Sequence, residues 1–579
     1  MRLLRRWRSQ SSASSKNIDQ TIVLHLSKSR IPGLRQLKYV GRFLSPFERS
    51  VLYLCLLIAL GGLIFTGVIF YKNNIVLAPS DGGRYVEGII GNPQYINPLY
   101  ASLNDADADL ERLLFSRLFT RNSQDEAVGD LVESYEISPD GKIYTLHLKD
   151  ALWHNGDPVT SDDVISTFAL IQNPEYKSPL RPRFSGVSAT KLDDRTLSFN
   201  LSEAHRNFIR LLDFGIMPLS FWQAVNAQTM PLAELNIKPI GSGPYRFKTL
   251  TKSKTGTVRS YTLERNESYY GPKAHLDEIS FKFFASSEEL IAALNNGQLN
   301  GISYVDQASG QSIVAKNSLE YHQAALPDLN AVFFNLKSKN LVADKTIRQA
   351  LALAIDQNSI SEAAAGRWGM PARSLTPPFT AGAKDVFISD KAKAEQLLDA
   401  AGWAKSNEQR SKDGKELTVN LLAPENFKVA AEAVAAAWKS IGVKTQLTIQ
   451  PAEQIEKDAI ANKNFDALLY AVTVTGGDPF LVWRSSSEAN LSGWTRTDVD
   501  QWLAEARLLN DPAEAAKRYG AFQAVAADDV PAIPLYWRAY VYPQNKKIKG
   551  FSMISLEDPA ERFATAADWY IKVDRQFKK

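Results

Sequence analysis

The chain has 579 residues, more than a single hydrophobic core usually organises, so we expect two or more lobes. Hydrophobic residues make up 45% of it and charged residues 22%, which is typical of a globular protein and excludes collagenous, mucin-like and globally disordered classes. The net charge of +4 hides an asymmetry: residues 1–50 carry +9, so residues 51–579 carry −5 and lack the basic surface that nucleic-acid binding requires.

The segment 51–71 is an apolar run of 21 residues without a charged side chain. A helix of this length crosses a hydrocarbon core of about 30 Å, which predicts a transmembrane anchor. Since the positive charge precedes the run, we expect residues 1–50 to be a basic cytoplasmic tail. The bulk of the chain, beyond a tether at 72–83, is then extracellular or periplasmic. Fifty residues make a long n-region for a signal peptide, and Pro79 follows the candidate cleavage motif, so we interpret the anchor of this single-pass protein as uncleaved.

The stretch 152–164 (LWHNGDPVTSDDV) contains His154 and three aspartates within ten residues. This density raises the question of a metal or catalytic site. The alternating pattern of residues 142–149 predicts a half-buried strand just before it. Asn-Gly and Asp-Pro dipeptides then predict turns, and Thr160 with Asp163 matches the N-cap and N3 positions of a capping box. We therefore interpret the stretch as a connection between a strand and a helix.

The same stretch, extended to Phe168, resembles the signature of the family-5 extracellular solute-binding proteins, which are the peptide-, dipeptide- and nickel-binding subunits of ABC importers. Five further segments resemble segments of this family in the same order. They are 240–247 (IGSGPYRF), 265–284 (RNESYYGPKAHLDEISFKFF), 333–356 (FFNLKSKNLVADKTIRQALALAID), 366–378 (GRWGMPARSLTPP) and 394–403 (AEQLLDAAGW). Each segment alone is modestly specific, but six in order are specific, and the resemblance covers about residues 84–555.

The resemblance implies an α/β, periplasmic-binding-protein-like two-lobed type II fold with three subdomains, preceded by one transmembrane helix. The solute-binding domain is then expected at 84–579. Its expected parts are lobe I (about 84–110, 222–330 and 533–579), subdomain II (about 111–221) and lobe III (about 331–532).

The residues of lobe III predict the same class of fold independently. Their pattern predicts a β-α-β-α-β unit with parallel neighbouring strands, followed by a helical hairpin. The expected elements are strands at 416–423, 444–450 and 465–474, helices at 427–443 and 452–463, and hairpin helices at 498–509 and 514–529. For the first helix we expect a buried face formed by Val429, Ala433, Ala436, Ala437 and Ile441.

In open α/β sheets, ligands bind beyond the carboxyl ends of the strands, which points to the loop 475–483 (TGGDPFLVW). Gly476 and Gly477 would let the backbone approach a ligand, Asp478 could accept from an amine, and Trp483 could form a wall. The alternative is a plain turn in which Asp478 caps a helix.

The resemblance sharpens this expectation. Many peptide-binding members of the family carry an acidic residue that pairs with the ligand's α-amino group, three positions before the acidic residue of this Asp-Pro pair. That position is Thr475 here, so the chain departs from the peptide pattern. Either Asp478 substitutes for the missing carboxylate, or the ligand is not an ordinary peptide with a free N-terminus, because a buried ammonium without a partner costs several kcal/mol. By their place in the family's first cleft loop and pocket segment, Tyr95, Asn97 and Trp494 are further candidates, with core packing as the alternative for each.

We therefore expect a monomeric, membrane-anchored solute-binding protein that captures a peptide or similar small solute and delivers it to ABC permease and ATPase subunits. Two alternatives remain: a ligand sensor or scaffold with the same fold, and a cell-wall-acting enzyme. The chain contains no HExxH, GxSxG or P-loop motif, and its six histidines are scattered. Its single cysteine excludes a multi-cysteine metal site. We expect no catalytic residue, no metal and no cofactor.

Overall fold

The computed structural model describes residues 44–578, except 123–125, 206, 305–311, 315, 339, 379, 381, 510, 554 and 555. Most of the expected basic tail thus lies outside the described residues. The chain divides into two compact units, 1–78 with 573–579, and 79–572. Each unit is described separately below.

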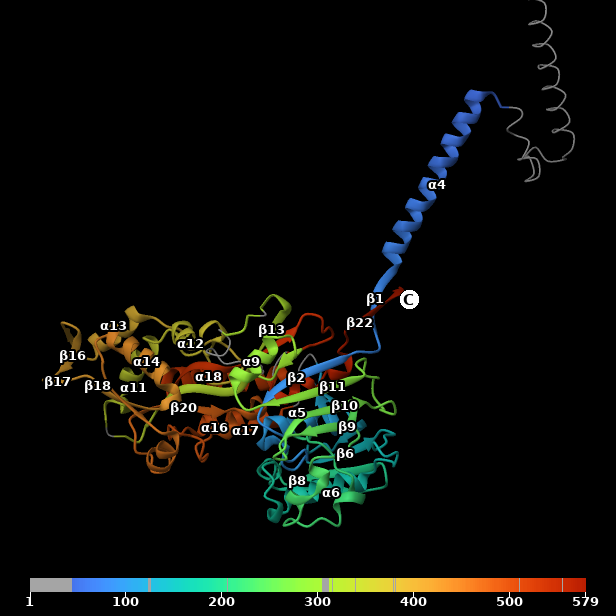
Figure 1. The fold of residues 1–579 in the computed structure, drawn as a ribbon. Coiled ribbons are helices and arrows are strands. Elements are labelled where there is room, and N and C mark those ends of the chain that lie inside the picture. The colour runs from blue at the N-terminus through green and yellow to red at the C-terminus, as the bar shows by residue number, and fades with distance from the viewer. Residues whose placement is uncertain are drawn as a thin grey trace, which may run out of the picture. The chain divides into compact units, whose positions relative to one another are not determined.

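The first unit contains one long helix, α4 (Pro46–Asn74), drawn in blue in Figure 1. Ser45 caps its N-terminus, and Glu48 completes a capping box by accepting from the Ser45 backbone N–H at 2.7 Å. No residue of the helix is buried, and among the described helices it alone is long and apolar enough to cross a membrane. The helix therefore contains the predicted segment 51–71 and extends a few residues beyond both of its ends. Strand β1 (Ile75–Ser80), which pairs with β22 (Lys572–Phe577), follows within the expected tether.

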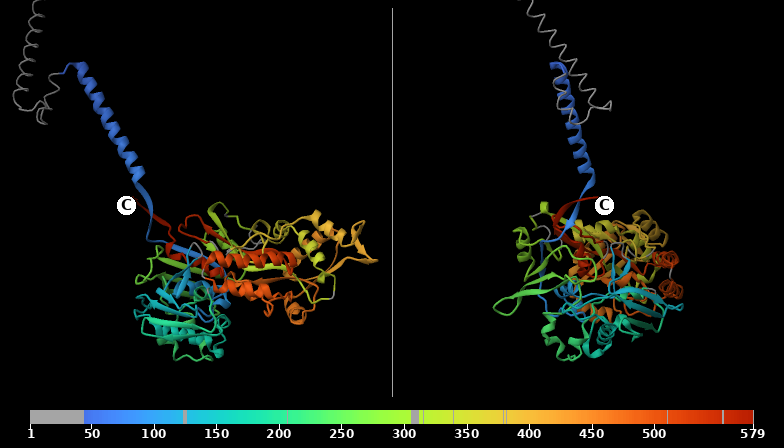
Figure 2. Two further views of the ribbon diagram at one scale, coloured as in Figure 1. Left: turned by 180° about the vertical axis from the view of Figure 1, so that it is seen from behind. Right: turned by 90° about the vertical axis from the view of Figure 1, so that its right-hand side faces the viewer.

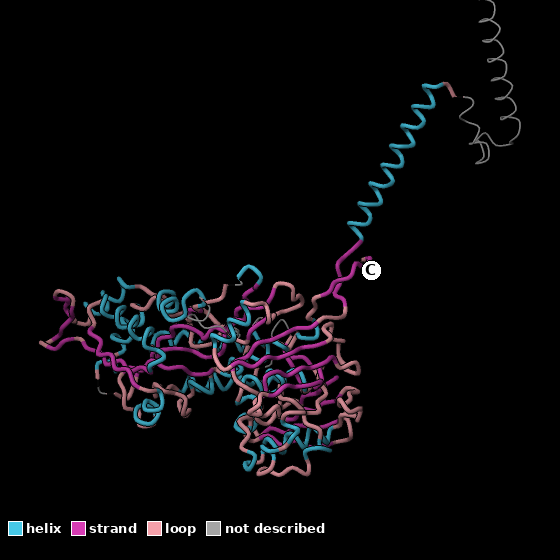
Figure 3. Tube along the Cα trace, in the orientation of Figure 1, coloured by secondary structure: helices cyan, strands magenta, loops and turns pink. Residues whose placement is uncertain are grey.

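An eleven-stranded sheet organises the second unit. Its longest strands, β13 (Leu319–Phe334) and β21 (Ala532–Asn545), pair antiparallel along most of their length and run between the residue ranges expected as lobe I and lobe III. Figure 1 shows β18 and β20 toward one end of the sheet and β2, β11, β10 and β9 toward the other, and Figure 3 shows these strands in magenta with helices around them. In lobe I the remaining strands are β2 (Arg84–Ile90), β9 (Tyr245–Lys252), β10 (Val258–Arg265), β11 (Glu278–Phe284) and β12 (Gly301–Ile302).

Lobe III contains the predicted β-α-β-α-β unit. Strand β18 pairs in parallel with both β19 and β20, as expected. The strands and helices are β18 (Thr418–Pro424), α14 (Lys428–Ser440), β19 (Lys444–Gln450), α15 (Ala452–Gln454) with a π-helical turn at Ile455–Ile460, and β20 (Ala467–Thr473). Helices α17 (Thr497–Leu508) and α18 (Pro512–Asp529) form the predicted hairpin.

The predicted buried face of α14 was wrong at Val429 and Ala436, which are exposed, whereas Ile441 is fully buried and Ala433 and Ala437 are partly buried against the core. Its buried residues are Ala430, Ala431, Val434 and Trp438, whereas Val429 is 54% exposed. The indole of Trp438 explains the rotation, because it stacks on Phe334 of β13 and donates its Nε1–H to the backbone carbonyl of Leu351 at 3.1 Å. Burying this large ring determines which side of an alanine-rich helix faces the sheet.

The other elements of lobe III and the helices that border the sheet complete this part of the fold. They are α9 (Ser287–Asn295), α11 (Lys345–Leu353), α12 (Gln357–Ala365), α13 (Lys391–Ala400), α16 (Phe480–Trp483), β14 (Met370–Pro371), β15 (Ala404–Ser406), β16 (Gln409–Lys412) and β17 (Lys415–Glu416).

Subdomain II is built on a separate four-stranded antiparallel sheet, visible in cyan in both views of Figure 2. Its strand order is β5 (Val132–Ile137), β6 (Ile143–Leu148), β8 (Thr196–Leu201) and β7 (Val187–Lys191). The predicted strand at 142–149 is confirmed as β6, with Tyr144, Leu146 and Leu148 buried on one face. The other elements here are α5 (Asp105–Leu114), which leads in from lobe I, β3 (Phe119–Arg121), β4 (Ala127–Gly129), α6 (Ser161–Gln172), α7 (Phe208–Leu211) and α8 (Leu219–Trp222).

The stretch 152–164 is a strand-to-helix connection, as predicted. Asp163 accepts from the Thr160 backbone N–H at 2.8 Å at the start of α6, and also from the Leu219 N–H at 2.8 Å. The His154 ring accepts from the Gly241 N–H at its Nδ1 (3.1 Å) and meets the Gly243 carbonyl at its Nε2 (3.2 Å). Since a carbonyl only accepts, Nε2 carries the proton and the ring is neutral. The described residues contain no group of three or more His, Cys, Asp or Glu placed to hold a metal ion.

The neutral His154 ring makes a pH-dependent contribution to stability. Burial lowers the pKa of His154 to about 4, so the unfolded chain, in which histidine titrates near 6.5, binds the proton first as the pH falls. We expect this contribution to be lost between pH 6.5 and 4, up to about 3 kcal/mol. Urea unfolding of the full-length protein in detergent micelles, compared with His154→Gln across this range, measures it. Parallel pH curves for the two proteins would contradict the expectation.

Candidate functional site

A cavity of about 180 Å³ lies where lobe I, subdomain II and lobe III meet. We call it the central cavity. Residues of α5 line it together with the subdomain II segments around 117–121, 180–183 and 210–215. Pro327 of β13 and Thr473 at the end of β20 contribute from the large sheet, and the segment 557–561 closes it from lobe I. At about 30 Å³ per water molecule this volume holds roughly six waters, so it suits a small solute unless the lobes separate.

The lining of the central cavity is strongly charged and balanced in sign. The charged residues are Arg112, Arg117, Arg121, Arg183 and Arg210 on the basic side, and Glu111, Asp213, Glu557, Asp558 and Glu561 on the acidic side. Five guanidinium groups beside five carboxylates favour a polar, charged ligand over an apolar one.

Three of the arginines are neutralised within the protein. Asp213 pairs with Arg112 at 2.7 Å and with Arg117 at 2.8 Å, and Arg117 also pairs with Glu111. Burial raises the pKa of Asp213, but the two arginines outweigh it and hold this pKa below its usual value. These pairs fix the wall of the cavity formed by α5 and the residues that follow it.

The third of these arginines, Arg121, links subdomain II to lobe I. Arg121 of β3 pairs with Glu561, whose carboxylate also accepts from the Glu557 backbone N–H at 2.7 Å. Burial raises the pKa of Glu561 to about 7, against the lowering influence of Arg121. Asp558 is engaged locally as well, since it caps the short 3₁₀ helix Pro559–Phe563 by accepting from the Ala560 N–H at 2.7 Å.

The predicted loop after β20 reaches the edge of the central cavity through its backbone. Gly476 and Gly477 have φ angles of +64° and +65°, a left-handed conformation that favours glycine. The Gly476 N–H donates to Glu557 Oε2 at 2.8 Å, so the loop contacts a residue that lines the cavity. The side chain of Thr475 lies outside the described part of the chain.

Asp478 is occupied by other groups. Its side chain is 4% exposed, pairs with Arg507 at 2.9 Å and accepts from the Phe480 N–H at 3.0 Å at the start of α16. It is not among the described residues that line the central cavity. This geometry matches the cap that the sequence left as the alternative, so a role for Asp478 in accepting a ligand amine finds no support.

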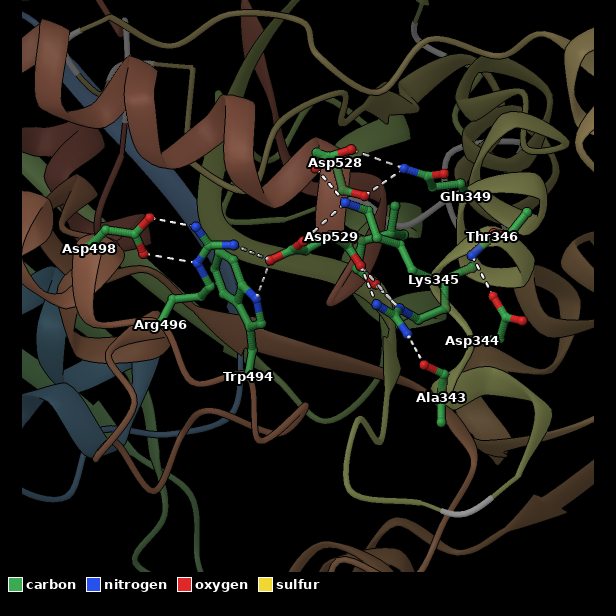
Figure 4. A network of polar contacts seen from close by, with 12 residues as sticks. Ala343, Asp344, Lys345, Thr346, Gln349, Trp494, Arg496, Asp498, Asp528 and Asp529 are labelled. Atoms are coloured by element: carbon green, nitrogen blue, oxygen red, sulfur yellow. Dashed lines mark hydrogen bonds and ion pairs between the residues drawn. The ribbon is translucent and has the colours of Figure 1, made fainter.

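The two predicted tryptophans pack in the core of lobe III. Trp483 is 1% exposed and stacks on Phe333, with ring centroids 5.9 Å apart. Trp494 is 3% exposed and donates its Nε1–H to Asp529 at 3.0 Å. Figure 4 shows Asp529 between Trp494 and Arg496 on one side and Lys345 on the other. Neither indole lines the central cavity, because the large rings fill the space between the sheet and the helical hairpin.

The candidates from the first cleft loop lie elsewhere too. Asn97 is fully buried, accepts from the Leu99 N–H at 2.9 Å and donates to Asn236 at 3.2 Å, so it braces its own loop. Tyr95 is half-buried and borders a second cavity of about 830 Å³, together with Tyr100 and Tyr176. Packing was the alternative interpretation for Asn97, and the contacts of its side chain agree with it.

Sequence reasoning missed the charged residues of the central cavity. The only signal was the spacing of three arginines in RLLFSRLFTR (112–121) and the mixed charges of EDPAER (557–562). These segments are more than 430 residues apart in the chain, and nothing local indicates that they meet.

Comparison with known proteins places the chain among related sequences. The family described as bacterial extracellular solute-binding proteins, family 5 (middle), matches residues 126–491. The oligopeptide-binding protein AppA of Bacillus subtilis (strain 168) is 28% identical over 496 residues, which is 81% of this chain and 87% of that protein. The dipeptide-binding protein of Escherichia coli (strain K12) is 25% identical over 496 residues, 80% of this chain and 90% of its own length. NikZ from Campylobacter jejuni, solved in complex with Ni(L-His), has a TM-score of 0.64 at 25% identity and covers 84% of this chain and 99% of its own.

These similarities confirm the expected α/β, periplasmic-binding-protein-like two-lobed fold. The relatives are binding proteins rather than enzymes, which agrees with the expectation for this chain. Their names specify an oligopeptide, a dipeptide and a nickel–histidine complex. The shared fold therefore accepts different solutes, and the lining of the site must distinguish them.

Proposed function

Because the chain belongs to the bacterial extracellular solute-binding proteins of family 5, we propose that it captures a small peptide or peptide-like solute in the central cavity and delivers it to an ABC permease and its ATPase. The observation that carries this proposal is the balanced set of guanidinium and carboxylate groups at the junction of the three subdomains. A peptide presents charges of both signs and backbone polar groups, and such a lining complements both.

Capture would depend on relative movement of the lobes. The strands β13 and β21 connect lobe I and lobe III, and both show register shifts in their pairing, between Ala325 and Leu329 and again between Asn330 and Ala331. An irregular ladder is a suitable place for a hinge, because fewer regular hydrogen bonds resist a change in backbone angles. The ligand drives closure by binding the closed arrangement more tightly than the open one. No covalent chemistry is required.

We further propose that α4 anchors this receptor in the cell membrane. The helix has 29 residues and a mean hydropathy of 2.5 over its most apolar window. At 1.5 Å per residue its length exceeds the hydrocarbon core of about 30 Å. The excess of Lys and Arg in residues 1–50 supports a cytoplasmic N-terminus and an external binding domain. A tether of this kind would raise the effective concentration of the loaded receptor at a permease in the same membrane.

Native mass spectrometry of the full-length protein, extracted in detergent from washed membranes, tests the proposal. We expect the protein in the membrane fraction after a high-salt wash, and we expect either co-purified masses of small peptides or binding of an added di- and tripeptide mixture. Protein that appears in the soluble fraction would contradict the anchor. Protein that is empty and gives neither a mass shift nor a thermal shift with the peptide mixture would contradict peptide capture and favour the sensor or scaffold alternative.

A further inference from the structure

Three of the charged groups that line the central cavity, Glu557, Asp558 and Arg183, have no ion-pair partner among the described residues. Arg112, Arg117 and Arg121 are neutralised by the carboxylates described above, and Asp558 caps a helix. Asp558 forms no ion pair but is used by its cap, and Arg210 is engaged, whereas Glu557 and Arg183 have neither an ion pair nor a capping role within the described chain. One anionic and one cationic group thus remain for a ligand.

The Glu557 carboxylate is held in place without being neutralised. Its Oε2 accepts the Gly476 N–H at 2.8 Å, and its own backbone N–H donates to Glu561. A neutral backbone donor orients the carboxylate and leaves its negative charge and further lone pairs available. Glu557 is also a lobe I residue in contact with a lobe III loop, so a ligand bound to it would lie against both lobes.

Arg183 is the corresponding cationic group, and it belongs to the 3₁₀ helix Arg181–Phe184 of subdomain II. Its neighbour Arg181 is engaged, since its Nε donates to the Gln172 carbonyl at 3.0 Å. Arg183 is exposed, lines the central cavity and makes no such bond within the described residues. A planar guanidinium in this situation is suited to bind a carboxylate through two parallel hydrogen bonds.

Resting on the proposed function, we propose that Glu557 binds the ammonium group of the ligand and that Arg183 binds its carboxylate. The preferred ligand is then a short zwitterionic peptide with both termini free. This assignment places the amine-binding carboxylate on the segment 557–561 of lobe I, and not on the loop 475–483. Under this assignment, Asp478 does not substitute for the carboxylate that is missing at Thr475. The ligand is still an ordinary peptide with a free N-terminus, because Glu557 binds its amine.

Competition binding by native mass spectrometry tests this assignment on the full-length protein in detergent. The probes are a mixture of di- and tripeptides of Ala, Ser and Leu, the same mixture N-acetylated, and the same mixture C-amidated. For the wild type we expect about 10- to 100-fold weaker binding of both modified mixtures, the size of one charge-assisted hydrogen-bonded pair. Glu557→Gln should lose the discrimination against acetylated peptides but keep that against amidated ones. Arg183→Gln should show the opposite pattern.

Matched controls separate recognition from structure. Glu488→Gln and Arg181→Gln make the same changes at exposed positions that do not line the central cavity, and both should discriminate as the wild type does. Glutamine at 557 still offers an oxygen to the Gly476 N–H, so we expect the fold to be kept. A structural role would weaken binding of all three mixtures equally. That result, or a wild type that binds free and acetylated peptides equally, overturns the assignment alone. A wild type that binds none of the mixtures overturns the proposed peptide function as well.

Discussion

Replacing Arg562 by methionine is expected to lower the free energy of unfolding by about 3–5 kcal/mol. The Arg562 side chain is 1% exposed, donates to Asp109 Oδ1 at 2.7 Å and to Glu87 Oε1 at 3.0 Å, and lies over the ring of Phe563. Methionine has a similar length but leaves two fully buried carboxylates without a cation. The desolvation of those carboxylates is then uncompensated.

The pH dependence of this loss follows from the same geometry. Burial raises the pKa of Asp109 to about 7, although Arg562 lowers it. Without the guanidinium the folded-state pKa rises further, while the unfolded chain still ionises near pH 4. A raised carboxyl pKa makes the folded state lose stability as the pH increases toward that pKa. The cost of the substitution should therefore be larger at pH 8 than at pH 5, as measured by urea unfolding of the full-length protein in micelles.

Two comparisons make the Arg562 result specific. Arg195→Met makes the same change in an exposed pair with Asp150, where we expect a loss below about 1 kcal/mol. Adding Asp109→Asn and Glu87→Gln to Arg562→Met removes the two buried carboxylates that have lost their cation. The triple variant should therefore recover part of the lost free energy of unfolding. A cost below 1 kcal/mol for Arg562→Met, or a cost equal at both pH values, would show that the buried cluster does not behave as described.

Gly241→Ala is expected to destabilise the protein by about 3 kcal/mol and to weaken ligand binding. A Cβ at position 241 would lie 1.9 Å from the Leu114 carbonyl oxygen and 3.3 Å from His154 Cε1. Both neighbours are constrained, because the Leu114 carbonyl accepts from the Gly243 N–H and the His154 ring accepts from the Gly241 N–H. Relief would move the C-terminal turn of α5, which carries Glu111 and Arg112 of the central cavity.

Gly520→Ala is the matched control for this prediction. Gly520 lies inside α18, and a Cβ there meets nothing within 4 Å. Alanine in a helix interior is favoured over glycine by up to about 1 kcal/mol, so this variant should be unchanged or slightly more stable. Urea unfolding and the peptide competition assay should be applied to both variants. Equal stability of Gly241→Ala and Gly520→Ala would contradict the backbone clash.

Residue patterns predicted much of the fold because the interactions behind them are local. The alternation of Tyr144, Leu146 and Leu148 predicted a half-buried strand, and Thr160 with Asp163 predicted the start of α6, since each involves residues a few positions apart. Residue patterns predicted the structure less well where tertiary packing decides which face of an element is buried. The predicted buried face of the alanine-rich helix α14 included Val429, which is exposed, because the contact between Trp438 and Phe334 turns a different side of the helix to the sheet.

The candidate site was predicted least well. The loop after β20 contacts a residue of the cavity lining through Gly476, whereas Asp478, Trp483 and Trp494 are engaged within lobe III. A tryptophan in a loop can pack in a core as well as line a pocket. An acidic residue there can cap a helix as well as bind a ligand. Composition cannot separate these roles, because the neighbours that distinguish them come from distant segments.

Local interactions in the sequence thus determined the long apolar helix α4, the strand and helix order of lobe III, and the turns of 152–164. Only the tertiary structure decided where charge is buried. The segment DADADLERLL of α5 has the composition of an exposed helix, yet nine of its ten residues are buried. Glu111 and Asp109 are tolerated there because Arg117 and Arg562 pair with them, and Arg562 lies 453 residues beyond Asp109 in the chain. Burial of a charge is favourable only when a partner meets it in three dimensions, and such a meeting leaves no periodic pattern in the sequence.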